Sequence, residues 1–455
     1  MPNIELLIAG CGVSGKAAAT LAATLHKEYV ILDETDSTDI REFIAKLPFP
    51  PADILIPWNA EKPLPYHFHT AVMSPGIRRT SPIFRCIADA ADKMTGELLF
   101  AAANSDCPMI GITGTNGKTT VTELTTALFR AVGKKADAAG NIGAGLSNAV
   151  LAYQDGKVEL LIVEISSFQL ENANTFPVEA AAVLNLASDH IDRHGSMEEY
   201  ARLKFILANS AKKAVVLNSN LDEYRRKYLH SSVSVITFSA TTPDADFTLS
   251  EKRIIHYRGK PVFDCAKTAL KGNHNVENIM AALALLISIE GEQILSCPEI
   301  TRALASFKPS AHRLECFLQQ NNISYIDDSK ATNPHAVNAA LDFYGQNKNI
   351  LILLGGLDKN MDFRELIPHL SNARKVYLTG ACREQIKTQL QNHCEMEIYP
   401  SFSAAVQAMC AEAKSGDTVM LSPATASMDE FKNYKERGNR FQELVRQYVS
   451  KENPE

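Results

Sequence analysis

A glycine-rich segment between a predicted strand and a predicted helix constrains the fold of this 455-residue chain more than any other feature. Residues 108–113 are strand-like, Gly114-Thr-Asn-Gly-Lys-Thr-Thr120 follows, and residues 121–130 are amphipathic. Glycines let the backbone curl so that successive N–H groups face one phosphate, and the N-terminus of the next helix adds a positive dipole end. Lys118 supplies a positive charge and Thr119 a hydroxyl for Mg²⁺. The segment predicts a cradle for a nucleoside triphosphate, with a plain glycine-rich turn as the alternative.

Length, charge and cysteine usage exclude several classes of protein. At ~150 residues per domain the chain has room for about three domains. Its formal net charge is −6 with no basic block, so we expect no nucleic-acid partner. The first residues do not resemble a signal peptide, and the longest apolar stretch, residues 281–289, is too short to span a membrane. Because the nine cysteines are scattered singly, we expect reduced thiols and hence a cytoplasmic protein. We also expect a monomer without a membrane partner.

The first of three sequence blocks, residues 1–96, begins like a dinucleotide-binding domain. A strand-like run over residues 4–9 is followed by Gly10-Cys-Gly-Val-Ser-Gly15, a helix and a second strand that ends at Asp33. This spacing matches the G-x-G-x-x-G pattern with an acid about 20 residues later. Taken alone, the pattern suggests NAD or FAD. Its physical content is narrower, because it predicts only a tight turn and a helix N-terminus that hold a diphosphate near Asp33.

The second block, residues 97–309, and the third, residues 310–455, both alternate strands with helices. This alternation indicates an α/β fold with mainly parallel sheets covered on both faces. We expect three domains: a Rossmann-like N-terminal domain, a central P-loop domain and a Rossmann-like C-terminal domain. In the central block, residues 272–278 are expected to cap a helix over residues 279–289. Open sheets of this kind bind ligands at the carboxyl ends of their strands.

Polar residues that end strands in the second block are candidates for metal chemistry. Glu164 ends an apolar strand, and a buried acid is costly unless it meets a cation, so Mg²⁺ shared with Thr119 is expected. A helix cap or an ion pair is the alternative for Glu164. Ser188-Asp-His-Ile-Asp-Arg-His194 is a dense polar cluster that includes His190. Lys204 lies on a predicted helix, where a single lysine is normally solvated.

Polar loops of the third block could contact nucleotide or an acidic substrate. Arg313 could bind a phosphate or a nucleotide edge, and Asp328 could bind ribose hydroxyls. Lys359, which follows a strand and two glycines, could bind a carboxylate. For each of these residues, loop solvation or capping is the alternative.

These motifs together resemble the Mur ligase family of peptidoglycan synthesis, and among its members those that add D-glutamate. The resemblance covers all three blocks, and the compact spacing of Gly114 and Gly117 is part of it. Its further motifs are Ser74-Pro-Gly-Ile77, Gly140-Asn-Ile-Gly143, Glu164-Ile-Ser-Ser-Phe-Gln-Leu170, Asp189-His-Ile-Asp-Arg-His194, Gly272-Asn-His-Asn275, His312-Arg-Leu-Glu315, Asp328-Ser-Lys-Ala-Thr-Asn333 and Ser422-Pro-Ala-Thr-Ala-Ser-Met-Asp429.

The resemblance implies a role for individual residues of this chain. The UDP-substrate contacts would be Ser14, Asp33, Glu34, Thr35, Gly76 and Asn141. The ATP contacts would be Gly114, Thr115, Asn116, Gly117, Lys118, Thr119, Thr120, Asn275, Arg313 and Asp328. The metal ligands would be Thr119, Glu164, His190 and Lys204, with Lys204 carbamylated by CO₂, and Lys118, His190 and Lys204 would be catalytic. The D-glutamate contacts would be Thr332, Lys359, Ser427, Met428 and Tyr434.

The activity implied is ATP-dependent ligation of D-glutamate to UDP-N-acetylmuramoyl-L-alanine through an acyl phosphate, with Mg²⁺, two ions being expected. Closure of the third domain over ATP is expected before chemistry. Three alternatives stay open. A sister ligase would add a different amino acid, a nicotinamide oxidoreductase would explain the Gly10–Gly15 motif, and a non-enzymatic P-loop binding protein would explain the loop around Lys118.

Overall fold

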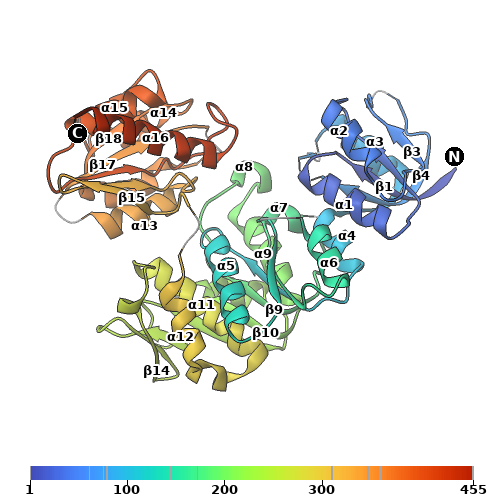
Figure 1. Cartoon of the computed structure of the whole chain (residues 1–455), viewed down its shortest axis with the longest axis horizontal. Coiled ribbons are helices and arrows are strands. Elements are labelled where there is room, and N and C mark those ends of the chain that lie inside the picture. Colours follow the sequence, from blue (N-terminus) through green and yellow to red (C-terminus); the bar gives the residue numbers. More distant parts are fainter. Residues whose placement is uncertain are drawn as a thin grey trace. The chain divides into compact units, whose positions relative to one another are not determined.

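The computed structural model describes residues 2–60, 62–74, 76–77, 80–142, 145–171, 173–308, 311–345, 348–357 and 361–452. It contains three β-sheets (Figure 1). The chain divides into two compact units. The first unit comprises residues 1–185, 201–269 and 276–307, and the second comprises residues 186–200, 270–275 and 308–455.

The N-terminal sheet is entirely parallel, with strand order β3-β2-β1-β4-β5. Its elements are β1 (Asn3–Ala9), α1 (Val13–Thr24), β2 (Tyr29–Leu32), α2 (Thr38–Ala45), β3 (Asp53–Leu55), β4 (His67–Met73), α3 (Pro82–Ala90) and β5 (Ala91–Gly96). Leu7, Val30 and Phe68 are fully buried in its core, as expected for strands covered on both faces. The strand order is that of a dinucleotide-binding half, which agrees with the Rossmann-like fold predicted from the glycine motif.

The central sheet has nine strands in the order β14-β13-β12-β11-β10-β9-β6-β8-β7. Its strands are β6 (Met109–Thr113), β7 (Ala136–Gly140), β8 (Leu160–Glu164), β9 (Val178–Val183), β10 (Ala211–Asn218), β11 (Ser234–Ser239), β12 (Phe247–Leu249), β13 (Ile254–Tyr257) and β14 (Lys260–Asp264). All pairs from β7 to β12 are parallel, whereas β12, β13 and β14 form an antiparallel extension that was not predicted.

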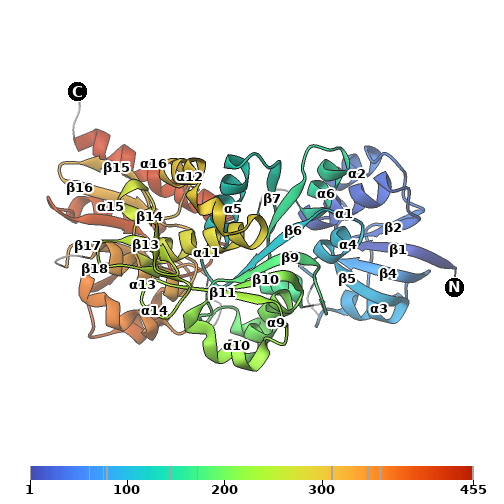
Figure 2. The same ribbon diagram turned by 90° about the horizontal axis from the view of Figure 1, so that it is seen from below.

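Helices cover both faces of the central sheet. The helices in this stretch of the chain are α4 (Glu97–Ala103), α5 (Lys118–Ala131), α6 (Leu146–Gln154), α7 (Ser167–Leu170), α8 (Ile191–His194, in the second compact unit), α9 (Met197–Asn209), α10 (Asp222–Tyr228), α11 (Asn273–Glu290) and α12 (Pro298–Ser306), with 3₁₀ turns η1 (Ser219–Leu221), η2 (Cys265–Lys267) and η3 (Glu292–Ser296). Figure 2 shows α9 and α10 on one face and α5, α11 and α12 on the other. Close packing of α9 requires Gly111 in β6, because a Cβ there would lie 2.6 Å from Leu207.

The predicted cap of α11 is wrong in its position. The helix begins at Asn273, so the segment expected to precede it already forms its first turns. Gly272, with a φ of +83°, is the residue that turns the chain into the helix. The residues after Gly272 are polar, as loop residues often are. Only the backbone geometry shows that they form the first turn of a helix.

The C-terminal sheet has the order β15-β16-β20-β17-β18-β19 and is parallel except for the edge strand β15. Its elements are β15 (Glu315–Gln320), β16 (Ile323–Asp327), α13 (Pro334–Tyr344), β17 (Ile350–Leu354), η4 (Phe363–Asn372), β18 (Ala373–Leu378), α14 (Arg383–Leu390), β19 (Met396–Ile398), α15 (Phe402–Glu412), β20 (Thr418–Leu421) and α16 (Tyr434–Glu452). Separate apolar cores lie on its two faces, one beneath α13, η4 and α14 and one beneath α15 and α16. The predicted α/β class with mainly parallel sheets is confirmed.

The link between the first two sheets is built around one buried carboxylate. Glu97, the first residue of α4, accepts a hydrogen bond from the backbone N–H of Ser147 at 2.6 Å, and it thereby caps the N-terminus of α6. Burial raises the pKa of Glu97. Gly145, which precedes α6, packs so closely that a Cβ there would lie 2.9 Å from Ala17 on α1.

Among the described residues, no helix combines the length and the apolar character needed to cross a membrane.

Candidate functional site

The predicted phosphate loop lies at the carboxyl end of β6, an interior strand of the central sheet. β8 and β9 flank β6 as parallel neighbours, so the ends of all three strands meet at one edge. Gly114 has a φ of +153° and Gly117 a φ of +83°, which are backbone conformations that other residues rarely adopt. Helix α5 begins at Lys118, directly after Gly117. The backbone therefore has the strand–loop–helix form that the sequence predicts for a phosphate cradle.

Two lysine side chains converge on one carbonyl of this loop. Lys118 Nζ donates to the backbone oxygens of Gly114 at 2.9 Å and Thr115 at 2.7 Å. Lys204 Nζ also donates to the Gly114 oxygen, at 2.9 Å, and lies 3.4 Å from Oγ1 of Thr113. Lys204 is only 1% exposed. The interpretation of Lys204 as a solvated helix lysine is therefore wrong, since α9 directs its side chain to the loop; only the family resemblance singled it out.

Glu164, the last residue of β8, has a buried carboxylate of which only one oxygen is hydrogen-bonded. Asn141 Nδ2 donates to Oε1 at 2.8 Å, while Oε2 has no hydrogen-bond partner among the described residues. The backbone N–H of Asn141 also donates to the Glu164 carbonyl, at 2.9 Å. Burying a carboxylate oxygen without a partner is costly, and a hard cation satisfies such an oxygen well. The carboxylate thus fits a divalent cation better than it fits the alternative role of a helix cap.

Asn185, which follows β9, also contacts the loop but was not predicted to take part. Its side chain forms two hydrogen bonds with the backbone of Asn116. A polar residue directly after an apolar strand is the only sequence signal that could have found it.

The glycine motif of the N-terminal sheet forms a tight turn before α1. Gly10 has a φ of +88°, and a Cβ at Gly15 would lie 1.6 Å from the Gly10 oxygen, so only glycine fits. Asp33 follows β2 and accepts hydrogen bonds from the N–H of Cys11 at 2.5 Å and of Thr35 at 2.8 Å. The structure thus brings together several predicted UDP contacts at the carboxyl ends of β1 and β2. They are Ser14, Asp33, Glu34 and Thr35. Gly76, after β4, is exposed.

In the second unit, a turn at residues 312–314 carries Arg313. His312 and Leu314 have φ values of +64° and +45°. The imidazole of His312 lies with Nδ1 2.7 Å from Oδ2 of the buried Asp327. Arg313 Nε is buried without a hydrogen-bond partner among the described residues. The turn therefore carries an arginine whose Nε–H is able to donate a further hydrogen bond.

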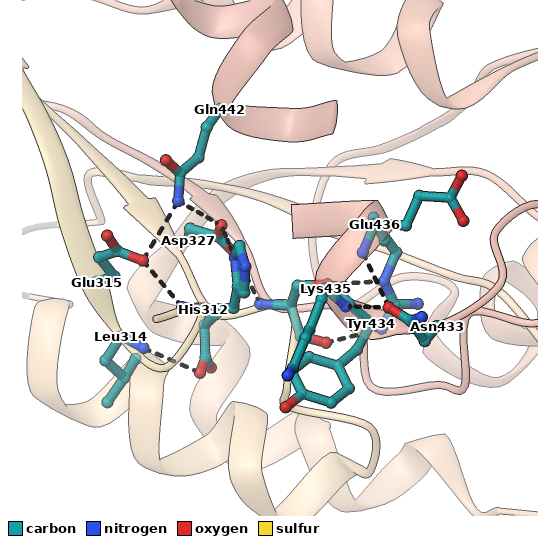
Figure 3. A network of polar contacts seen from close by, with 12 residues as sticks. His312, Leu314, Glu315, Asp327, Asn433, Tyr434, Lys435, Glu436 and Gln442 are labelled. Carbon is teal, nitrogen blue, oxygen red and sulfur yellow. Dashed lines mark hydrogen bonds and ion pairs between the residues drawn. The ribbon is translucent and has the colours of Figure 1, made fainter. Parts of the chain in front are cut away.

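Asp327 and Glu315 belong to a hydrogen-bonded network that includes the C-terminal helix (Figure 3). Gln442 Nε2 on α16 donates to Asp327 Oδ2 at 2.9 Å and to Glu315 Oε2 at 3.3 Å. The N–H of His312 donates to Glu315, and the N–H of Ser329 donates to Asp327. His312, Glu315 and Asp327 are close enough for a metal site. Because protein donors already occupy their oxygens, they form a structural network instead.

Asp328, which follows Asp327, is deeply buried. It accepts hydrogen bonds from Ser422 Oγ at 2.7 Å and from the N–H of Leu314 at 3.2 Å. Burial raises the pKa of Asp328 to about 7, and the nearby charge of Arg313 opposes that shift. A carboxyl group with this pKa and a fixed orientation is able to bind hydroxyl groups.

The predicted D-glutamate contacts lie around the start of α16. Ser427 is buried, Met428 is 66% exposed, and the Tyr434 carbonyl accepts a hydrogen bond from Ser329 Oγ at 2.8 Å. Thr332 is half-buried in the loop that begins with Asp328. Lys359 lies outside the described residues.

Arg437, which was not predicted, joins the two loops that carry these residues. Its guanidinium donates to Oγ and O of Ser329 at 3.0 and 2.8 Å. It also donates to the backbone oxygens of Thr425 at 3.1 Å and Ala426 at 3.3 Å. An arginine in a polar stretch of sequence reads as a surface residue, so no local signal reveals that Arg437 is 2% exposed.

Two further predicted residues, His190 and Asn275, also lie in the second unit, whereas Glu164 and Lys204 lie in the first. His190 precedes α8 with a φ of +56°, and its Nε2 lies 3.6 Å from Oδ1 of Asp189. Asn275 is in the first turn of α11 and donates to the Lys271 oxygen at 2.8 Å.

Comparison with known proteins agrees with this arrangement. Residues 112–286 match the model of the Mur ligase middle domain, and residues 312–425 match that of the Mur ligase glutamate ligase domain. A UDP-N-acetylmuramoylalanine--D-glutamate ligase from Vibrio cholerae is 32% identical, with 98% of each chain covered. A relative with the same name from Protochlamydia amoebophila is also 32% identical, over 97% of this chain and 98% of that protein.

Solved structures show the same fold at lower identity. A UDP-N-acetylmuramate-alanine ligase from Thermotoga maritima is 17% identical with a TM-score of 0.60, and 99% of each chain is covered. The MurF ligase of Thermotoga maritima, solved in complex with ADP, is 15% identical with a TM-score of 0.62 over 94% of this chain and 96% of that one. With relatives of this identity along almost its whole length, the chain belongs to the Mur ligase family.

Proposed function

We propose that this chain is an ATP-dependent ligase that joins D-glutamate to UDP-N-acetylmuramoyl-L-alanine in the cytoplasmic synthesis of peptidoglycan precursors. The observation that carries the proposal is the match, along 98% of the chain, to relatives named for this activity. The geometry supports the ATP-dependent part, because the phosphate loop, two lysines and a partly unpaired buried carboxylate meet at the end of β6. As in the sequence analysis, we expect a monomer.

Activation of the acceptor carboxylate is the step that needs the phosphate loop. A carboxylate does not form an amide at neutral pH until one of its oxygens is made a leaving group. Transfer of the γ-phosphoryl group to the alanyl carboxylate gives an acyl phosphate, and the amine of D-glutamate then displaces phosphate. Lys118 and the N–H groups at the start of α5 would stabilise the negative charge during the transfer.

Glu164, with its unpaired Oε2, fits a divalent cation, and Thr119 at the start of α5 would be a further ligand. Mg²⁺ held at this position would neutralise negative charge on the phosphates. The contribution of His190 to a second cation stays a prediction from the family resemblance. The same holds for the UDP contacts, and for Thr332, Lys359, Ser427, Met428 and Tyr434 as D-glutamate contacts.

Lys204 is proposed to react with CO₂. The Nζ lone pair attacks the carbon of CO₂, one C–O π pair moves onto oxygen, and one proton leaves to water, which gives a carbamate. The carbamate nitrogen keeps one N–H, so it can still donate to the Gly114 oxygen, which Lys204 Nζ contacts at 2.9 Å. The new carboxylate would provide oxygen ligands for a cation in a buried position.

The test measures phosphate release from ATP in the presence of UDP-N-acetylmuramoyl-L-alanine and one amino acid at a time. We expect release with D-glutamate, and little with L-glutamate, L-lysine or meso-diaminopimelate. Release with a different amino acid would make the chain a sister ligase. If ATP binds but no amino acid stimulates release, the ligase assignment is wrong and a non-enzymatic P-loop protein is favoured. Binding of NADH would favour an oxidoreductase.

A further inference from the structure

Asn185 holds the middle of the phosphate loop through three hydrogen bonds. Its side-chain oxygen accepts from the N–H of Asn116 at 2.8 Å, and its Nδ2 donates to the Asn116 carbonyl at 3.1 Å. Its own backbone carbonyl accepts from the N–H of Thr115 at 3.0 Å. One residue thus binds the backbone of two consecutive loop residues, Thr115 and Asn116.

The contact between the Asn185 side chain and Asn116 extends the pairing of β6 and β9 past the end of their backbone ladder. The β6–β9 ladder pairs Thr113 with Val183, and the N–H of Leu184 donates to the Thr113 oxygen at 3.0 Å. At Gly114 the chain leaves the extended conformation with a φ of +153°. A primary amide carries the same donor and acceptor as a peptide group, so the Asn185 side chain replaces the next strand residue as a partner for Asn116.

Ordering the loop between Gly114 and Gly117 costs conformational entropy. Glycines lose the most conformational freedom on ordering, and both ends of the Thr115–Asn116 segment are glycines. Lys118 Nζ binds the carbonyl of Thr115, on the segment that Asn185 holds through its N–H groups. If Asn185 were lost, part of the cost of ordering this segment would fall on nucleotide binding, and binding would weaken accordingly.

The hydrogen bonds of Asn185 also divide the amide groups around the loop into two sets. The N–H groups of Thr115 and Asn116 donate to Asn185. Helix α5 begins at Lys118, and the first N–H groups of an α-helix point out of its N-terminus. The second set is the one directed at an anion.

We propose that Asn185 is a positioning residue, which orders the Thr115–Asn116 segment so that the amides at the start of α5 are presented to the nucleotide phosphates. The proposal rests on the use of ATP by this chain and not on the identity of the amino acid that it ligates.

The first experiment compares ADP affinity, measured by calorimetry on the full chain, between the unmodified protein and Asn185→Ala. We expect Asn185→Ala to bind ADP about five- to tenfold more weakly, as for the loss of one or two hydrogen bonds. Asn185→Asp keeps the acceptor for the Asn116 N–H but places an oxygen against the Asn116 carbonyl, so it should bind no better than Asn185→Ala. If the side chain served only to fill space, the isosteric Asn185→Asp would bind as the unmodified protein does.

Asn209 provides a matched control in the same unit. Its side-chain amide donates to the Tyr228 carbonyl at 2.9 Å and accepts from the N–H of His230 at 2.8 Å, which is the same pair of bonds at the surface. Asn209→Ala should change ADP affinity less than twofold. UDP binding provides a second control, because a loss of UDP affinity equal to that of ADP in Asn185→Ala would indicate general unfolding and overturn the proposal.

A measurement on the unmodified chain keeps the test independent of whether the variants fold. Hydrogen–deuterium exchange resolved to single residues should find the amides of Thr115 and Asn116 protected with and without ADP. The amides from Lys118 to Thr120 should gain further protection when ADP is added. Free exchange of the Asn116 amide without ADP would contradict the proposal. Because neither readout uses an acceptor, a chain that binds ADP but joins no D-glutamate would overturn the proposed function alone.

Discussion

The side-chain amide of Asn141 binds one carboxylate oxygen of Glu164 at 2.8 Å, and the other oxygen is buried without a hydrogen-bond partner among the described residues. Asn141 was predicted to contact the UDP-sugar. The observed bond gives it a second effect, because it fixes the rotation of the carboxylate and determines which oxygen is left for a cation.

Asn141→Ala should therefore raise the Mg²⁺ concentration needed for half-maximal activity, by about three- to tenfold, as for loss of one hydrogen bond to a charged group. Binding of Mn²⁺ with ADP, followed by electron paramagnetic resonance, should weaken to the same extent without any turnover. Asn148→Ala, at an exposed position of α6, is the control. An increase only in the KM for the UDP-substrate would show that Asn141 acts as a substrate contact alone.

Lys204→Ala should lower activity by at least about 100-fold, because the charged groups around a transferring phosphoryl group contribute several kcal/mol. Carbon-13 NMR with labelled bicarbonate should show a carbamate signal in the unmodified chain and none in the variant. Lys212→Ala, which removes an exposed lysine paired with Glu179, should keep both activity and signal. Full activity of Lys204→Ala would rule out the carbamate.

Asp328→Asn should change how stability depends on pH. Burial raises the pKa of Asp328 in the folded chain from its ordinary value of 3.8 to about 7, so the folded state binds more protons between these pH values. The free energy of unfolding contributed by this group falls as pH rises through that window, at about 1.4 kcal/mol per unit of pKa difference. The variant does not lose stability in this way, because its amide does not titrate. Urea unfolding from pH 5 to 8 should therefore show the variant gaining stability relative to the unmodified chain as pH rises.

The control for this pH series is Asp89→Asn, at an exposed position on α3, which should follow the unmodified chain. Parallel curves for Asp328→Asn and the unmodified chain would show that the buried carboxyl group does not hold its proton.

Arg437→Lys should destabilise the second unit by about 2–4 kcal/mol, because lysine keeps the charge but cannot make the four hydrogen bonds of the buried guanidinium. The measurement is the free energy of unfolding from urea titration. Arg440→Lys is the matched control, since Arg440 lies on the same helix in an ion pair with Glu443 and its side chain is 40% exposed. That change should stay within about 0.5 kcal/mol. Equal effects of the two substitutions would refute a clamping role for Arg437.

The sequence predicted those parts of the fold that depend on local pattern. The apolar run that ends at Glu164 is a strand, and the helix predicted to carry Lys204 is α9. The antiparallel strands β12–β14 were missed because they are short and only half-buried, so they lack a continuous apolar run. The start of α11 was misplaced because Asn and His are as common in loops as in a first helical turn.

The candidate site was predictable where chemistry is carried by one residue type at a fixed spacing, as in the loop around Lys118. Contacts between distant segments were not predictable. Composition alone made Lys204 a solvated lysine, and nothing local marked Asn185 or Arg437 as buried partners of backbone groups. Their roles depend on which strand ends lie side by side, and this is decided by sheet order.

The buried carboxylate of Glu97 has a consequence for how the chain can be divided. Glu97 immediately follows the last strand of the N-terminal sheet, yet its side chain caps α6 of the central block. A fragment that stops before Glu97 would lack that carboxylate, and a fragment that starts after it would leave the first turn of α6 uncapped. Proteolysis should therefore release the two blocks of the first unit together, since neither is complete without the residue at their junction.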